Sequence, residues 1–130
     1  MFTVTTPPKT AVVLIVEDDR EMRSLLCDEF WSAGYRLREA KNGEEALEAV
    51  LQSEPDLILT DLRMPRGGAE YIGRLRTMAP YCPIIVMTAF GDAGLRAEVL
   101  RVGASAYFDK PVRISDLKKK VEELLSDSRK

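Results

Sequence analysis

Short apolar runs alternate with longer amphipathic segments along most of the chain. The first run, residues 11–16, holds six apolar residues rich in β-branched types, which is typical of a strand covered on both faces. Residues 35–40 differ, because apolar and charged residues alternate there, as expected for a half-exposed edge strand. The predicted strands are residues 11–16, 35–40, 57–59, 84–87 and 106–108.

The segments between these runs repeat apolar residues every three or four positions, which is the pattern of helices with one buried face. Gly34 lies where the first of these patterns ends, as glycine does after many helices. The apolar positions of the five predicted helices fall within residues 22–33, 46–51, 71–78, 95–102 and 114–125.

Strict alternation of strands and helices predicts an α/β fold in which helices cover both faces of a parallel sheet. With residues 35–40 at an edge, we expect a doubly wound, flavodoxin-like sheet of five strands in the order 2-1-3-4-5, with five helices. The ligand crevice of such a sheet lies at the carboxyl ends of strands 1 and 3.

The length of 130 residues predicts a single domain, which we place at residues 11–125, with a flexible leader at 1–10 and a tail at 126–130. The formal net charge of −2 gives no bulk attraction to nucleic acid or to a membrane surface. Histidine is absent, which excludes Ser-His-Asp hydrolysis and His-ligated zinc.

Cys27 and Cys82 have no CxxC spacing, and no signal peptide or apolar span of about 20 residues is evident. We therefore expect reduced, buried thiols in a cytoplasmic protein.

Polar residues follow the predicted strands where their carboxyl ends should meet. Glu17 and Asp18 follow the first strand, Asp61 the third, Thr88 the fourth and Lys110 the fifth. Three carboxylates and one ammonium group sum to −2, and a divalent cation would offset their mutual repulsion. Oxygen ligands favour Mg²⁺, for which Mn²⁺ could substitute, and a carboxylate in such a site can itself accept a phosphoryl group.

Four segments in these places carry a resemblance to a known family: residues 13–19 (VLIVEDD), 60–65 (TDLRMP), 87–89 (MTA) and 103–111 (GASAYFDKP). In this order they resemble the receiver domain of two-component response regulators, in particular chemotaxis-type regulators. The resemblance covers nearly all of residues 11–125.

The resemblance implies a signalling domain rather than an enzyme, although one that assists its own phosphorylation and dephosphorylation. It makes Asp61 the phosphoacceptor, and it implies a Mg²⁺ site formed by Glu17, Asp18, Asp61 and the main-chain carbonyl of Arg63. The phosphoryl donor would be a sensor histidine kinase or a phosphotransfer protein.

The remaining roles also come from the resemblance. Lys110 would pair with the phosphoryl group, the Thr88 hydroxyl would turn toward it, and Tyr107 would move inward behind Thr88 as the aromatic switch. A downstream protein or effector domain would then bind the face formed by the fourth helix, fifth strand and fifth helix. We expect no direct contact with nucleic acid or membrane, and a monomer or weak dimer.

The residues at two positions near the site lead us to expect slow self-dephosphorylation. Arg63 and Phe90 each lie two residues after a key residue, Asp61 and Thr88 respectively, where they would flank the path of an attacking water. A guanidinium and a phenyl ring there should hinder that water. The loop at residues 66–69 is also one residue shorter than is usual in the family, which affects partner contacts.

Two other function classes compete with this reading. A Mg²⁺-dependent phosphohydrolase of the haloacid dehalogenase type would place a DxD motif after the first strand, and Glu17, Asp18 and Asp19 do not form one. An interaction module that is never phosphorylated would be expected to lack an acid, the threonine or the lysine, and all are present.

Overall fold

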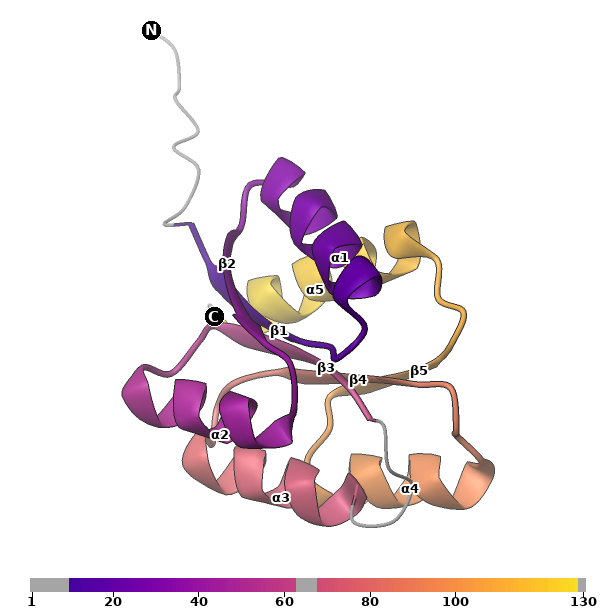
Figure 1. Cartoon of the computed structure of the whole chain (residues 1–130). Helices are drawn as coiled ribbons and strands as arrows, with labels where there is room; N and C mark the ends of the chain where they lie inside the picture. The colour runs from indigo at the N-terminus through magenta and orange to yellow at the C-terminus, as the bar shows by residue number, and fades with distance from the viewer. Residues whose placement is uncertain (1–9, 63–67, 129–130) are drawn as a thin grey trace, which may run out of the picture.

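Five strands alternate with five helices in the computed structural model, which describes residues 10–62 and 68–128 (Figure 1). In chain order they are β1 (Val12–Val16), α1 (Arg20–Ser32), β2 (Arg36–Ala40), α2 (Gly43–Gln52), β3 (Leu57–Asp61), α3 (Gly68–Met78), β4 (Ile84–Thr88), α4 (Ala93–Val102), β5 (Ala106–Asp109) and α5 (Ile114–Ser128). Helix α5 thus extends into the segment assigned to the tail. The proposed leader lies outside the described residues, apart from Thr10.

The strands form one parallel sheet in the order β2-β1-β3-β4-β5, which confirms the predicted doubly wound topology. Strand β3 lies at the centre and all five of its residues are buried. Strand β2 lies at an edge with a mixed burial pattern, as its alternating sequence predicts. The central position of β3 sets its last residue, Asp61, between the ends of β1 and β4.

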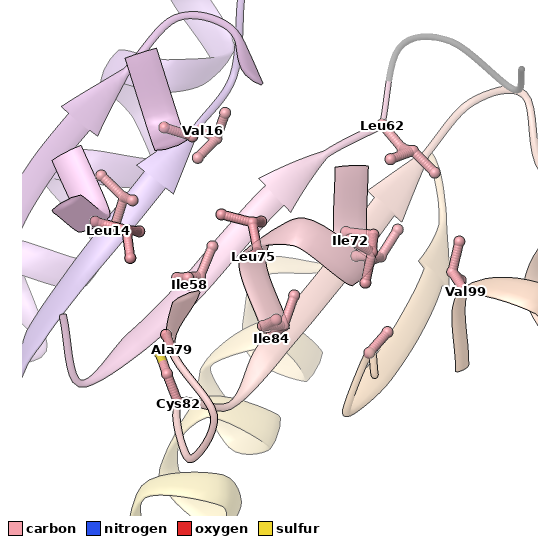
Figure 2. Close-up of a cluster of buried hydrophobic side chains, with 14 of the residues drawn as sticks. Leu14, Val16, Ile58, Leu62, Ile72, Leu75, Ala79, Cys82, Ile84 and Val99 are labelled. Atoms are coloured by element: carbon pink, nitrogen blue, oxygen red, sulfur yellow. The ribbon is translucent and has the colours of Figure 1, made fainter. Parts of the chain in front are cut away.

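Helices cover both faces of the sheet (Figure 1), and a cluster of buried apolar side chains lies on each face. On one face α1 and α5 pack over Val13, Ile15 and Leu59 with Phe30 and Leu117. On the other face α2, α3 and α4 pack over alternate residues of the same strands, as Figure 2 shows for the cluster around Leu14, Ile58, Ile72 and Ile84. Alternate strand residues therefore serve different layers, because successive side chains point to opposite faces.

The residues that flank α1 cap the helix at both ends, and Gly34 follows its C-terminal end as predicted. The carboxylate of Asp19 accepts hydrogen bonds from the main-chain N–H groups of Glu21 and Met22, which makes Asp19 the N-cap. Gly34 has φ of 100°, a left-handed conformation that closes the helix and that other residues rarely adopt.

Arg76 joins the ends of α3 and α4. Its guanidinium donates to the carbonyl oxygens of Ala79, Pro80 and Cys82 after α3, and to Gly103 O after α4 at 2.7 Å from Nη2. Gly103 has φ of 136°, and a Cβ there would lie 2.8 Å from Arg76 Cγ. One side chain therefore satisfies the carbonyls at both helix ends, and only glycine fits opposite it.

Two predictions about single side chains need correction. Cys82 is buried, but Cys27 is only partly buried, and burial raises the pKa of Cys27 to about 11 and that of Cys82 to about 12. From its place after Phe30 in the first helical pattern, Trp31 is also predicted to pack rather than to serve in recognition, but it is 69% exposed beside the fully buried Phe30. Within the described residues, no helix is long and apolar enough to cross a membrane.

Candidate phosphoacceptor site

The predicted site residues do meet at one edge of the sheet. Glu17 follows β1, Asp61 is the last residue of β3, Thr88 is the last residue of β4, and Lys110 follows β5. They meet because the carboxyl ends of parallel strands lie along the same edge. The strands before Glu17, Asp61 and Thr88 are buried at these ends, whereas β5, which leads to Lys110, is only partly buried.

Lys110 bridges two of the carboxylates. Its Nζ lies 2.8 Å from Glu17 Oε1 and 3.1 Å from Asp61 Oδ1. The Glu17 side chain is 1% exposed and that of Asp61 is 5% exposed, whereas 19% of the Lys110 side chain is exposed. The ammonium group therefore offsets two nearly buried negative charges.

The pKa values reflect this burial and pairing. Burial raises the pKa of Glu17 above its usual range, although the hydrogen bond from Lys110 works in the opposite direction. For Lys110, burial alone would lower the pKa, but hydrogen bonds to Glu17 and Asp61 outweigh it and raise the pKa. Lys110 is therefore a fixed positive charge at neutral pH.

Glu17, Asp18 and Asp61 fit a hard divalent cation. One carboxylate oxygen from each can be chosen so that all three lie within 4.8 Å of one another. Glu17 and Asp61 are buried and Asp18 is exposed, so the cluster opens to solvent on one side. An all-oxygen set with an open side suits Mg²⁺, which keeps several of its waters. Arg63, whose carbonyl was expected to complete the set, lies outside the described residues.

Thr88 contacts the main chain beside the candidate phosphoacceptor. Its hydroxyl donates to Leu62 O at 2.8 Å and accepts from the Phe90 N–H at 3.0 Å. Thr88 is 1% exposed, so both bonds are shielded from water. Because Leu62 directly follows Asp61, these bonds hold the hydroxyl beside the phosphoacceptor. To reach a group on Asp61, the hydroxyl would have to leave these partners.

Tyr107 is partly buried, and its hydroxyl lies under Gly91, where an added Cβ would come within 2.9 Å of Tyr107 Cζ. Among the described residues this hydroxyl has no partner with ordinary hydrogen-bond geometry. Burial, followed by the nearby Asp109 carboxylate, raises its pKa to about 12. Arg96 of α4 lies over the ring, with Cζ 5.8 Å from the centroid. Tyr107 therefore connects β5 to α4, and on the sheet it lies beside Val86 of β4.

The sequence pattern placed Tyr71 only among the inward-facing positions of the third predicted helix, and did not predict that it lies beside the site. Its hydroxyl lies 3.0 Å from Thr60 Oγ1, and its ring lines a cavity of about 490 Å³ that Asp18 and Asp61 also line. The apolar spacing of α3 indicates that Tyr71 faces inward, but no local pattern indicates that its hydroxyl meets β3.

Comparison with known proteins agrees with this geometry. The family model for the response regulator receiver domain matches residues 13–122. The chain is 34% identical over 114 residues to sporulation initiation phosphotransferase F of Bacillus subtilis, covering 87% of this chain and 92% of that protein. The chain therefore belongs to the response regulator receiver domain family.

Other relatives are longer than this chain. Over 114 residues it is 36% identical to the response regulator MprA of Mycobacterium leprae, but these residues are 87% of this chain and 50% of that protein. Among solved structures, a CheY-like response regulator receiver domain protein from Methanospirillum hungatei superimposes with a TM-score of 0.87 at 26% identity. The match covers 93% of this chain and 98% of that one. The flavodoxin-like receiver fold and the signalling class are thus both established.

Proposed function

We propose that this chain is a phosphorylation-dependent switch in which Asp61 accepts a phosphoryl group from a histidine kinase or a phosphotransfer protein. The observation that carries this proposal is the pairing of a nearly buried Asp61 with Lys110 at 3.1 Å, inside a three-carboxylate cluster open on one side. A buried carboxylate with a fixed cation and an exposed approach is suited to attack an incoming phosphorus atom.

In the proposed transfer, an Asp61 carboxylate oxygen forms a bond to phosphorus while the bond from phosphorus to the donor imidazole nitrogen breaks. The imidazole keeps the electron pair of the broken bond. Lys110, already 3.1 Å from Asp61 Oδ1, would bind the phosphoryl oxygens as they approach. Mg²⁺ held by Glu17, Asp18 and Asp61 would supply further positive charge for these oxygens.

The response would begin at Thr88. A phosphoryl group of about two negative charges beside Thr88 and Lys110 offers the hydroxyl a stronger acceptor than Leu62 O. Tyr107, which contacts Gly91 in the segment before α4 and Arg96 in α4, would follow as the aromatic switch. The surface of α4, β5 and α5 would then bind a downstream partner with changed affinity.

The direct test is intact-mass spectrometry after incubation with acetyl phosphate and Mg²⁺. We expect a mass gain of one phosphoryl group that disappears in Asp61→Asn and when Mg²⁺ is removed. The matched control is Asp28→Asn, an exposed carboxylate on α1, which should be phosphorylated normally. A folded protein that gains no mass would refute the proposal.

We further propose slow self-dephosphorylation. Phe90 is 51% exposed and its N–H donates to the Thr88 hydroxyl, so its main chain lies beside the site. With Arg63 it would hinder an attacking water. Replacing both with Arg63→Asn and Phe90→Glu should accelerate loss of phosphate, and an unchanged rate would count against the proposal.

A further inference from the structure

Two threonine hydroxyls hold successive carbonyl oxygens at the end of β3. Thr60 Oγ1 donates to Asp61 O at 2.9 Å, and Thr88 Oγ1 donates to Leu62 O at 2.8 Å. Thr60 and Thr88 are 0% and 1% exposed, so water does not compete for these oxygens. The main chain that carries the phosphoacceptor is therefore fixed from two sides.

Tyr71 supports the first of these hydroxyls. Its own hydroxyl lies 3.0 Å from Thr60 Oγ1. A threonine hydroxyl has one proton, and Thr60 donates it to Asp61 O, so Tyr71 is the donor in the second bond. Burial raises the pKa of Tyr71 to about 12, which keeps this proton in place at neutral pH. The bonds thus run in one direction, from Tyr71 to Thr60 to Asp61 O.

The Tyr71 ring is itself held in place by α2. A Cβ on Gly43, the first residue of α2, would lie 3.2 Å from Tyr71 Cε1, so the ring and the helix start are in close contact. Ring and hydroxyl together link α3 to both α2 and β3. Tyr71 therefore has little freedom to move away from Thr60.

The two carbonyl contacts would respond differently to phosphorylation. When Thr88 turns to a phosphoryl group on Asp61, it gives up Leu62 O. The bond from Thr60 to Asp61 O is independent of that turn and would remain. After that turn, the hydroxyl groups of Tyr71 and Thr60 would still hold the main chain of the phosphoacceptor through Asp61 O.

We propose that Tyr71 is a positioning residue for phosphoryl transfer, acting through the Thr60 hydroxyl to hold the main chain of Asp61 in place. This inference rests on the proposed function, because it concerns the rate of the same transfer. Loss of one neutral hydrogen bond that aligns the nucleophile should slow phosphorylation by about three- to tenfold.

The test compares rates of phosphorylation by acetyl phosphate and Mg²⁺ for the wild type, Tyr71→Phe, Thr60→Val and the double variant, followed by intact mass. Tyr71→Phe keeps the ring that contacts Gly43 and removes only the hydroxyl. Matched controls are Tyr81→Phe, at an 89% exposed tyrosine, and Thr77→Val, whose hydroxyl donates to Gly73 O on the exposed side of α3.

A stability control separates positioning from general loosening of the fold. Ile72→Val, next to Tyr71 in α3, removes one methylene from a fully buried side chain and should cost about 1 kcal/mol of stability. If Tyr71→Phe acts by positioning, it slows phosphorylation while Ile72→Val does not. Equal slowing in both variants would overturn the proposal.

The double variant and a conservative rescue complete the test. We expect the double variant to be no slower than the slower single variant, because both changes break the same chain of bonds. Thr60→Ser, which keeps the hydroxyl, should restore the wild-type rate. If the two substitutions slow phosphorylation by factors that multiply in the double variant, or if Tyr71→Phe reacts at the wild-type rate, the positioning role of Tyr71 is overturned while the proposed function stands. Failure of the wild-type chain to take up phosphate would instead refute the proposed function.

Discussion

Thr88 and Leu62 are joined by a 2.8 Å hydrogen bond that crosses from the end of β4 to the residue after β3. Because Thr88 also accepts from the Phe90 N–H, its hydroxyl satisfies two main-chain groups at a position that is 1% exposed. The residue expected to respond to phosphorylation therefore also supports the resting fold.

This double role predicts different outcomes for two substitutions of Thr88. Thr88→Val leaves Leu62 O and the Phe90 N–H without this partner and should lower the free energy of unfolding by about 1–3 kcal/mol. Thr88→Ser keeps the hydroxyl and should cost less than about 1 kcal/mol. Urea unfolding monitored by circular dichroism measures both. A loss in Thr88→Ser as large as that in Thr88→Val would show that the methyl group contributes as much as the hydroxyl, and would contradict the expected order.

Removal of Lys110 should destabilise the fold more than removal of Lys118, a more exposed lysine whose Nζ lies at the same distance from its carboxylate partner. Lys110→Met leaves Glu17 and Asp61 as adjacent, nearly buried carboxylates and should cost about 3 kcal/mol. The control is Lys118→Met. Lys118 pairs with Glu29, also at 2.8 Å, but at side chains 34% and 40% exposed, so about 0–1 kcal/mol is expected.

Mg²⁺ should stabilise Lys110→Met more than it stabilises the wild type. Without the ammonium group, the cluster of Glu17, Asp18 and Asp61 carries a charge that a divalent cation can offset directly. Thermal unfolding across a Mg²⁺ titration measures this difference. The same shift in both proteins would contradict a shared cluster.

The apolar pattern predicted most of the fold, because burial on one or both faces fixes the sequence period of each element. The polar residues that follow the strands predicted the site: Glu17, Asp18, Asp61, Thr88 and Lys110. They did not predict which partners these residues have. Lys110 and Glu17 are 93 residues apart, and the contact of Tyr71 with Thr60 depends on how α3 packs on β3. Such contacts arise from tertiary packing, so no local pattern records them.

Trp31 shows where the helical pattern is ambiguous. Phe30 and Trp31 are adjacent in α1, and neighbouring residues on a helix point about 100° apart. Only one of them can face the sheet, and Phe30 does so. The prediction that Trp31 packs rested on its place after Phe30 in the first helix, and the period of the helix decides against it.

Tyr71 should make stability pH-dependent in alkaline solution. Its pKa in the fold, about 12, lies above the ordinary value of 10.0, so the folded state holds the proton more tightly than the unfolded state. The contribution of Tyr71 to stability is therefore complete below about pH 10 and is lost as pH rises toward 12, by about 3 kcal/mol at most.

Urea unfolding of the wild type and of Tyr71→Phe at about pH 9 and about pH 11 tests this contribution. The wild type should lose more stability than the variant over this range. Tyr107 also has a raised pKa but is present in both proteins, so it cancels in the comparison. Parallel losses would contradict the burial of the Tyr71 hydroxyl.

Substitution of Arg76 should lower the free energy of unfolding strongly, although the Arg76 side chain is not fully buried. Arg76→Met removes the donor from the carbonyls of Ala79, Pro80, Cys82 and Gly103, and should lower the free energy of unfolding by about 2–4 kcal/mol. Arg101→Met, at an exposed position in the last turn of α4, is the control and should change it by less than about 0.5 kcal/mol. A small effect at Arg76 would mean that water replaces it at these carbonyls.

The shared guanidinium has a consequence for local unfolding. Because carbonyls directly after α3 and directly after α4 accept from the same side chain, neither helix end can fray without weakening the other. The two helices and the segment before β4 should therefore open to solvent as one cooperative unit, with matched amide hydrogen-exchange protection at the two helix ends. Arg76 thus couples the C-terminal ends of α3 and α4 in one local opening event.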